Sequence, residues 1–240
     1  MEVALLTIGD ELLAGDVENT NATWLARQLS ARGVAVRRIA VVPDVVAVIA
    51  DHVRAYGDAF DAVVCTGGLG GTPDDLTMES VAAAFDRPLV VNEAAREDVE
   101  RTLAAIAAEY PDLDVNVERH ASLPEGARPL LNPDGLSPGC VLENVYVFPG
   151  IPREMRAMFG LVAEEFAGDL RSRLLRTPLP ESEVTPTLEA AREELPEVIL
   201  GSYPSRGDDP NRVKITGETE AALDRAEAWL RERIEVEDGR

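Results

Sequence analysis

The sequence predicts an α/β fold, a three-layer αβα domain around a mostly parallel sheet, followed by a small C-terminal α+β lobe. Short apolar runs alternate with amphipathic stretches, which is typical of strands that helices cover on both faces. A glycine-rich loop joins one apolar run to a helical stretch. A polar, proline-rich stretch at residues 177–186 predicts the boundary between the domain, residues 1–172, and the lobe, residues 178–236.

The elements of the larger domain follow from hydrophobic periodicity. Apolar runs predict strands at residues 3–8, 34–42, 62–66, 128–131, 139–142 and 145–148. Helical spacing predicts one helix that ends before Gly33, three helices at residues 45–56, 76–85 and 93–109, and a last helix that begins at Pro152. Thr20 or Asn21 is the expected N-cap of the first of these helices, and Asp44 is a candidate cap of the second.

The lobe shows a different order of elements. Its pattern predicts a helix at residues 188–194, strands at 197–203 and 212–216 joined by a loop at 205–211, and a helix at 221–234. We expect residues 237–240 to form a frayed tail. The lobe is therefore expected to fold separately from the larger domain.

The composition is that of a globular protein without a membrane segment. Hydrophobic residues make up 45% of the 240 residues and the mean hydropathy is -0.07. There is no long apolar run and no basic N-terminal region, so a cytoplasmic protein is expected. Cys65 and Cys140 lie in apolar runs without metal-ligand spacing, which favours buried reduced thiols.

The net charge limits the classes of partner. Asp and Glu number 44 against 23 Lys and Arg, giving a net charge of -21, and Lys214 is the only lysine. Such a surface repels nucleic acids and anionic lipids, so no nucleic-acid or membrane partner is expected. An acidic excess with arginine in place of lysine also suits a halophilic host, although an ordinary acidic protein is the simpler interpretation.

The strongest chemical signal is the segment Thr66-Gly67-Gly68-Leu69-Gly70-Gly71-Thr72-Pro73-Asp74-Asp75-Leu76-Thr77. Glycines let the main chain approach a ligand closely, and the N–H groups of the following helix N-terminus favour phosphate. The segment lacks the lysine of a P-loop and the third glycine of a dinucleotide-binding fingerprint. The sequence therefore predicts a phosphate site of another kind.

Two aspartates follow this glycine loop directly. In the simpler interpretation, Asp74 or Asp75 is the N-cap of the next helix. In the other, the carboxylates hold Mg²⁺ or a similar hard cation that bridges to phosphate oxygens. One helix needs only one cap, so the pair favours the metal.

Three further segments are candidate ligand loops. They are residues 9–21, residues 132–139 and residues 149–155. The first follows a predicted strand at the edge where open α/β sheets bind ligands. Each of the three, taken singly, is explained as well by an ordinary turn.

Four motifs follow one another along the chain: GDELLxG with NTN, GGLG ending in DDLT, NPDGLSPG and PGIPREM. In this order they resemble the CinA N-terminal family of the MoaB/Mog molybdopterin-binding superfamily. The resemblance covers residues 3–166, and the lobe is similar to the family's KH-type accessory domain. Gly71, Asn19 and Ser137 depart from the usual family residues.

The resemblance implies a set of site residues. Asp75 and Asp44 are the expected catalytic residues, and with Asp74 the expected metal ligands. The expected phosphate and ligand contacts are Gly67, Gly68, Gly70, Thr72, Thr77, Asp10, Glu11, Asn21, Ser137, Gly139, Pro149 and Gly150. For Asp44 the helix-cap interpretation stays open.

The implied cofactor is a divalent metal, Mg²⁺ or Co²⁺, and molybdopterin is a possible ligand. Without a lysine near the loop, an anionic substrate would be repelled unless a cation and helix termini reverse the local potential. Since the KH-like lobe lacks the GxxG clamp and is acidic, packing or oligomerisation is its expected role.

Three functions remain open at this point. The first is a metal-dependent hydrolase of nucleotide diphosphates such as ADP-ribose. The second is a molybdenum-cofactor protein that binds or adenylylates molybdopterin. The third is a non-catalytic nucleotide-binding or assembly module. In each case we expect a small-molecule nucleotide or pterin partner and a homo-oligomer, either a dimer or a trimer.

Overall fold

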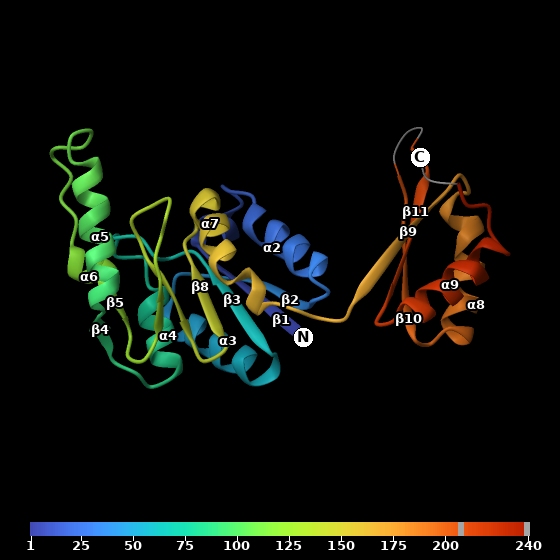
Figure 1. The fold of residues 1–240 in the computed structure, drawn as a ribbon, viewed down its shortest axis with the longest axis horizontal. Coiled ribbons are helices and arrows are strands. Elements are labelled where there is room, and N and C mark those ends of the chain that lie inside the picture. Colours follow the sequence, from blue (N-terminus) through green and yellow to red (C-terminus); the bar gives the residue numbers. More distant parts are fainter. Residues whose placement is uncertain (206–208, 238–240) are drawn as a thin grey trace. The chain divides into compact units, whose positions relative to one another are not determined.

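The computed structural model describes residues 1–205 and 209–237. It divides into two compact units, residues 1–167 and residues 168–240, each of which is considered by itself (Figure 1). Residues 206–208 and 238–240 lie outside the described residues. They are part of the predicted loop at 205–211 and of the predicted tail at 237–240.

The first unit contains a six-stranded sheet in the order β2-β1-β3-β8-β7-β6. Its strands are β1 (Glu2–Ile8), β2 (Ala35–Val42), β3 (Ala62–Thr66), β6 (Arg128–Leu130), β7 (Gly139–Leu142) and β8 (Val145–Phe148). Strands β2, β1, β3 and β8 are parallel, and β7 and β6 continue the sheet antiparallel. The sheet is mostly parallel, as predicted.

Helices cover both faces of this sheet. The helices of the first unit are α1 (Asp10–Ala14), α2 (Thr20–Ala31), α3 (Val46–Ala59), α4 (Thr77–Ala84), α5 (Glu93–Ile106), α6 (Val117–Ala121) and α7 (Pro152–Val162), with a 3-10 turn, η1 (Ala163–Glu165). One apolar core lies under α2 and α7, and the other lies under α3 and α4. The αβα layering is therefore the predicted one.

The connection around β1 places the candidate site. The chain leaves β1 towards β2 on one side and returns to β3 on the other. The carboxyl ends of β1 and β3 therefore diverge at a switch point, where open α/β sheets form a ligand crevice. Thr7 of β1 is aligned with Thr66 of β3, so the loops that begin at Gly9 and Gly67 start side by side.

Several local features differ from the expectations. The candidate ligand loop at residues 9–21 is partly helical, because residues 10–14 form α1. The N-cap of α2 is neither Thr20 nor Asn21 but Asn19, whose side chain accepts a hydrogen bond from Ala22 N at 3.1 Å. A small sheet of β4 (Leu89–Val91) and β5 (Ser122–Pro124) and the helix α6 were not predicted.

The second unit is a small α+β lobe. It consists of β9 (Arg171–Thr177), α8 (Glu181–Glu194), β10 (Val198–Tyr203), β11 (Asn211–Gly217) and α9 (Glu220–Arg231), with an antiparallel sheet in the order β10-β11-β9. The helices pack on one face of the sheet around their own apolar core. The stretch expected as a boundary forms the end of β9 and the first turns of α8, with Pro186 inside the helix.

Two expectations about the whole chain can be compared with the structure. Within residues 1–205 and 209–237, no helix has the length and apolar character needed to span a bilayer. Cys65 and Cys140 are both free and buried, as the sequence predicted. Burial raises the pKa of the Cys140 thiol to about 12 and raises that of Cys65 further.

Candidate functional site

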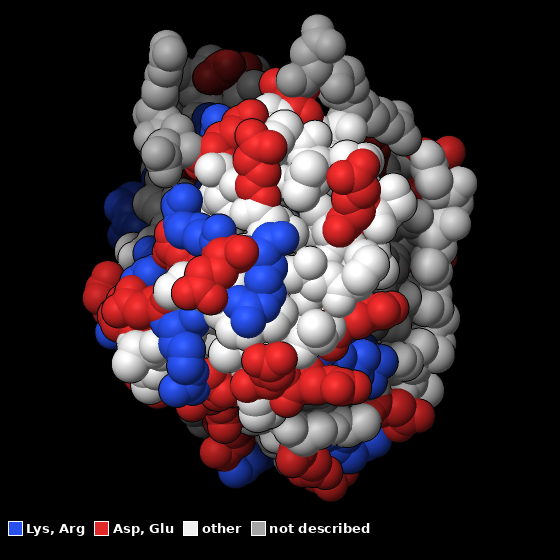
Figure 2. Space-filling model, turned by 90° about the vertical axis from the view of Figure 1, so that its right-hand side faces the viewer, with Lys and Arg blue, Asp and Glu red and all other residues white. Residues whose placement is uncertain are grey.

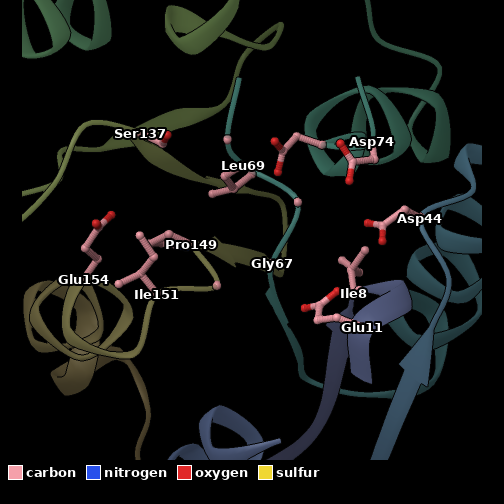
Figure 3. A pocket seen from close by; sticks show the side chains of 15 residues that line it. Ile8, Glu11, Asp44, Gly67, Leu69, Asp74, Ser137, Pro149, Ile151 and Glu154 are labelled. Carbon is pink, nitrogen blue, oxygen red and sulfur yellow. The ribbon is translucent and has the colours of Figure 1, made fainter. Parts of the chain in front are cut away.

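A cleft of about 290 Å³ lies at the carboxyl ends of β1, β3 and β8 (Figure 3). Its walls come from the loops that follow these strands and from the first turn of α7. The lining residues are Ile8, Gly9, Glu11, Asp44, Gly67, Gly68, Leu69, Gly70, Asp74, Asp75, Ser137, Pro149, Gly150, Ile151 and Glu154. The structure thus brings together residues from all four sequence motifs.

The glycine loop is held in a backbone conformation that only glycine adopts easily. Gly67 and Gly68 have φ values of 102° and 63°. A Cβ atom on Gly67 would lie 2.2 Å from the carbonyl oxygen of Ile8, and one on Gly68 would lie 2.4 Å from Thr77 Oγ1. Side chains at these positions would displace the loop from the end of β1.

Thr77 supports this loop from below and does not line the cleft, contrary to expectation. It is fully buried, its hydroxyl donates to the Gly67 carbonyl at 2.8 Å, and its N–H donates to the Gly68 carbonyl at 3.1 Å. The first residue of α4 therefore fixes the height of the glycine loop above the sheet.

Replacing Thr77 with valine is expected to lower the free energy of unfolding by about 1–3 kcal/mol. The substitution keeps the shape of the side chain but leaves the Gly67 carbonyl without this donor. Chemical denaturation followed by circular dichroism measures the effect, with Thr77→Ser as a control that keeps the hydroxyl. Equal stability of the parent and the valine variant would contradict the assigned role.

Three consecutive main-chain N–H groups of the loop donate no hydrogen bond within the described part of the chain. They belong to Gly68, Leu69 and Gly70. All three residues line the cleft. Free main-chain donors in a glycine loop before a helix are an arrangement that binds phosphate.

The carboxylate of Asp75 belongs to this loop and is not a helix cap. Asp75 Oδ2 accepts from the N–H of Thr72 at 2.9 Å and from its hydroxyl at 2.6 Å. The N-cap of α4 is Leu76, which provides no side-chain hydrogen bond. The simpler interpretation, in which Asp74 or Asp75 caps this helix, is therefore wrong. Thr72, expected as a ligand contact, is exposed, bonds to Asp75 and does not line the cleft.

Arg119 holds the outer side of the glycine loop, and its neighbour His120 contacts Ser137. The sequence analysis singled out neither residue. Arg119 Nη2 donates to the carbonyl oxygens of Thr72 and Asp75, both at 2.9 Å. His120 Nδ1 lies 3.0 Å from Ser137 Oγ, and burial lowers the pKa of its imidazole. These residues lie on the short helix α6, which carries no glycine motif and no strong periodicity.

Asp44 lies at the end of β2 and turns towards α1. Its Oδ2 accepts from the N–H of Asp10 at 2.9 Å, whereas the N-cap of α3 is Val45. The helix-cap interpretation of Asp44 is therefore wrong. Burial, together with the nearby charges of Asp10, Glu11 and Asp74, raises the pKa of the Asp44 carboxyl, although the Asp10 N–H opposes this shift.

Asp44→Asn is expected to raise the melting temperature of the metal-free protein at neutral pH. A raised carboxyl pKa in the fold means that the ionised form is less favourable there than in the unfolded chain, at any pH above the folded pKa. The amide keeps an oxygen for the Asp10 N–H. Calorimetry checks this, with exposed Asp58→Asn as the control, and a lower melting temperature for Asp44→Asn would contradict the electrostatic explanation.

The opposite wall of the cleft carries a further carboxylate, that of Glu154, which the sequence analysis did not single out. In Figure 3 the carboxylates of Glu11, Asp44 and Asp74 lie on one side and that of Glu154 on the other. Glu154 Oε2 accepts from Asn132 Nδ2 at 2.7 Å, and the same amide donates to the Ser137 carbonyl at 3.0 Å. Burial raises the pKa of the Glu154 carboxyl.

The remaining predicted residues lie beside the cleft. Asp10 contributes its N–H to Asp44, and Asn21 is buried with its Nδ2 donating to the Gly150 carbonyl at 2.7 Å. Gly139 is buried in β7, where a Cβ atom would lie 2.1 Å from the Val147 carbonyl oxygen. The family glycine at position 139 therefore reflects strand packing rather than ligand contact.

The carboxylates do not form a closed metal site by themselves. Within the described part of the chain, no group of three His, Cys, Asp or Glu side chains is placed to hold a metal ion. Mg²⁺ commonly takes one or two protein carboxylates and completes its shell with water and substrate phosphates. The arrangement of Asp44, Asp74 and Asp75 fits such an open site better than a structural metal centre.

Two family models match the chain, one for each unit. Residues 4–168 match the family described as "Probable molybdopterin binding domain". Residues 169–238 match the family described as "FAD synthase, middle domain". The division between the two matches agrees with the division into compact units.

Individual relatives give the same picture. A protein of Archaeoglobus fulgidus is 35% identical, over 86% of this chain and 87% of its own length. A CinA-like protein of Parasynechococcus marenigrum is 36% identical, over 96% of this chain but only 58% of its own length. The solved structure of CinA from Thermoplasma acidophilum, a protein of unknown function, is 33% identical, with a TM-score of 0.60 over 70% of this chain and 99% of that one.

Proposed function

The chain belongs to the CinA N-terminal family of the MoaB/Mog molybdopterin-binding superfamily, and we propose that it is a divalent-metal-dependent hydrolase of nucleotide diphosphates such as ADP-ribose. The observation that supports this most is the row of unpaired N–H groups at Gly68, Leu69 and Gly70, next to the carboxylates of Asp74 and Asp75. The amides suit phosphate oxygens, and the carboxylates suit the cation that accompanies a diphosphate.

The acidic character of the cleft supports the cation. Like charges add to the effect of burial in raising the pKa of Asp44, so the ionised carboxylates of this cluster repel one another. A diphosphate brought alone into this cluster would add further negative charge. A divalent cation held by one or two of the carboxylates of Asp44, Asp74 and Asp75 would neutralise charge on both the carboxylates and the diphosphate.

The remaining groups of the site hold the substrate and the loop in place. In the proposed reaction a water oxygen attacks one phosphorus, and the bond from that phosphorus to the bridging oxygen breaks. With ADP-ribose this gives AMP and ribose 5-phosphate. The loop amides bind the phosphate oxygens, Arg119 and Thr77 keep the loop rigid, and Glu154, whose pKa is raised, is placed across the cleft to accept a proton from water.

Removal of the metal tests the proposal directly. Purified protein is incubated with ADP-ribose, FAD or ATP, with Mg²⁺ or Co²⁺ and with EDTA, and the products are separated by chromatography. We expect cleavage of ADP-ribose with the metal and a loss of about 100-fold or more with EDTA. Equal binding of the nucleotide with and without EDTA, or no cleavage of any diphosphate, would contradict it.

The second candidate is a protein that binds or adenylylates molybdopterin. The match of residues 4–168 to the "Probable molybdopterin binding domain" favours it, because a small pterin is the partner that the description names. Incubation with molybdopterin, ATP and Mg²⁺ distinguishes the two functions. An adenylylated pterin without cleavage of ADP-ribose would replace the first proposal with this one.

A further inference from the structure

The three-stranded sheet of the second unit has one face without helices. In β9, β10 and β11, successive side chains point to opposite faces of the sheet. Leu175, Val213 and Ile215 lie on the face that α8 and α9 cover, because they belong to the core under these helices. The opposite face consists of nine positions, three from each strand. They are Ser172, Leu174, Arg176, Ile199, Gly201, Tyr203, Arg212, Lys214 and Thr216.

The charge of this open face is opposite to that of the chain. Its nine positions hold Arg176, Arg212 and Lys214, and they hold no Asp or Glu, although the chain carries a net charge of -21. Among the described residues, none of these three cations has a carboxylate within ion-pair distance. On the helix side of the same sheet, in contrast, Arg173 pairs with acidic residues of α9.

The open face also exposes apolar side chains. The relative solvent exposure of Leu174, Ile199 and Tyr203 is 51%, 63% and 48%. A Cβ atom on Gly201 would lie 3.0 Å from the Tyr203 ring, so this glycine gives the ring room to lie across the sheet. Exposed apolar groups mixed with tyrosine and arginine are typical of protein interfaces.

Helix α8 supplies the complementary charge. It contains Glu181, Glu183, Glu189, Glu193 and Glu194 and one arginine, and all five glutamates are exposed. Within the described residues, none of the five takes part in an ion pair. Figure 2 faces the side of this unit on which α8 and α9 lie, and it shows acidic side chains there together with several basic ones.

We propose that the open sheet face of the second unit binds the acidic helix α8 of a second copy of this chain. Two copies of the sheet face would repel each other, so the partner surface must be a different one. The acidic surface required is present on the same chain, and the exposed Leu174, Ile199 and Tyr203 would become buried in the contact. A nucleic acid is the less favoured partner because the chain as a whole would repel it.

Reversal of charge in the full-length chain tests this contact. The sheet variant carries Arg176→Glu and Lys214→Glu, and the helix variant carries Glu183→Arg, Glu189→Arg and Glu193→Arg. The control variant carries Arg38→Glu and Arg87→Glu, two exposed arginines of the first unit, and changes the net charge as much as the sheet variant. Light scattering after gel filtration gives each mass, and circular dichroism checks that each variant folds.

We expect the parent and the control to associate to at least twice the chain mass of 25.9 kDa, and each charge-reversed variant to lose this association. Because one variant has two acidic surfaces and the other two basic ones, an equimolar mixture should associate again. A parent that remains monomeric overturns the proposal, as does association that survives in either variant. Loss of association without recovery in the mixture shows that α8 is not the partner surface and also overturns it.

Discussion

Asp75→Asn is expected to lower the metal-dependent cleavage of ADP-ribose by on the order of 100-fold or more. Asp75 both orders the loop, through Thr72, and stands on the wall of the cleft where a cation would bind. The amide keeps one oxygen for the Thr72 N–H but removes the charge. Initial rates at saturating Mg²⁺ measure the effect, and titration of the metal should show weaker binding.

Two further variants separate charge from loop geometry. Thr72→Val removes the hydroxyl donor to Asp75 and keeps the carboxylate, so its rate should fall by no more than about 10-fold. Asp58→Asn changes an exposed aspartate at the end of α3 and should leave the rate unchanged. A rate for Asp75→Asn close to that of the parent would remove Asp75 from the proposed metal site.

Phe159→Ala is expected to lower the free energy of unfolding by about 3–5 kcal/mol. Phe159 of α7 is only 1% exposed, and its ring contacts those of Trp24, Phe148 and Phe166, with centroid separations of 5.5, 6.3 and 5.5 Å. The smaller side chain would leave a cavity where the helix α7 meets the sheet. Because α7 carries Glu154, the cleft should also lose rigidity.

Guanidinium unfolding followed by circular dichroism measures this loss. Leu161→Ala, on the exposed side of the same helix, removes an apolar side chain that is 57% exposed and should cost less than about 0.5 kcal/mol. If the two variants unfold at the same denaturant concentration, the aromatic cluster is not what holds α7 on the sheet.

Most strands of the first sheet could be predicted because they contain a short apolar run next to a glycine or a proline. The buried run Ala62–Thr66 followed by Gly67 is an example, and the helix from Pro152 is another. Strand β9 was missed because it belongs to a half-exposed antiparallel sheet, and its arginines interrupt the apolar pattern. Helix α8 was placed too short because the proline-rich stretch up to Pro186 suggested a boundary, whereas the helix begins at Glu181 and accommodates Pro186 in its second turn, at the loss of one main-chain hydrogen bond.

The candidate site was predictable in part, for a similar reason. Gly67, Gly68, Asp44 and Asp75 stand in compact motifs directly after strands, and they all line the cleft. Glu154 and Arg119 reach the site through long-range contacts that local spacing does not reveal. The error at Thr77 has the same origin, because a position within a motif does not tell whether a side chain faces the ligand or the core.

Both thiols of the chain lie in the first unit, at Cys65 of β3 and Cys140 of β7, and both are fully buried with raised pKa values. Alkylating reagents attack the thiolate, so neither sulfur should react while the surrounding sheet stays closed. The second unit contains no cysteine. The rate of maleimide labelling therefore measures the opening of the first unit alone, and a cysteine introduced on the lobe would accept a fluorophore without a competing site.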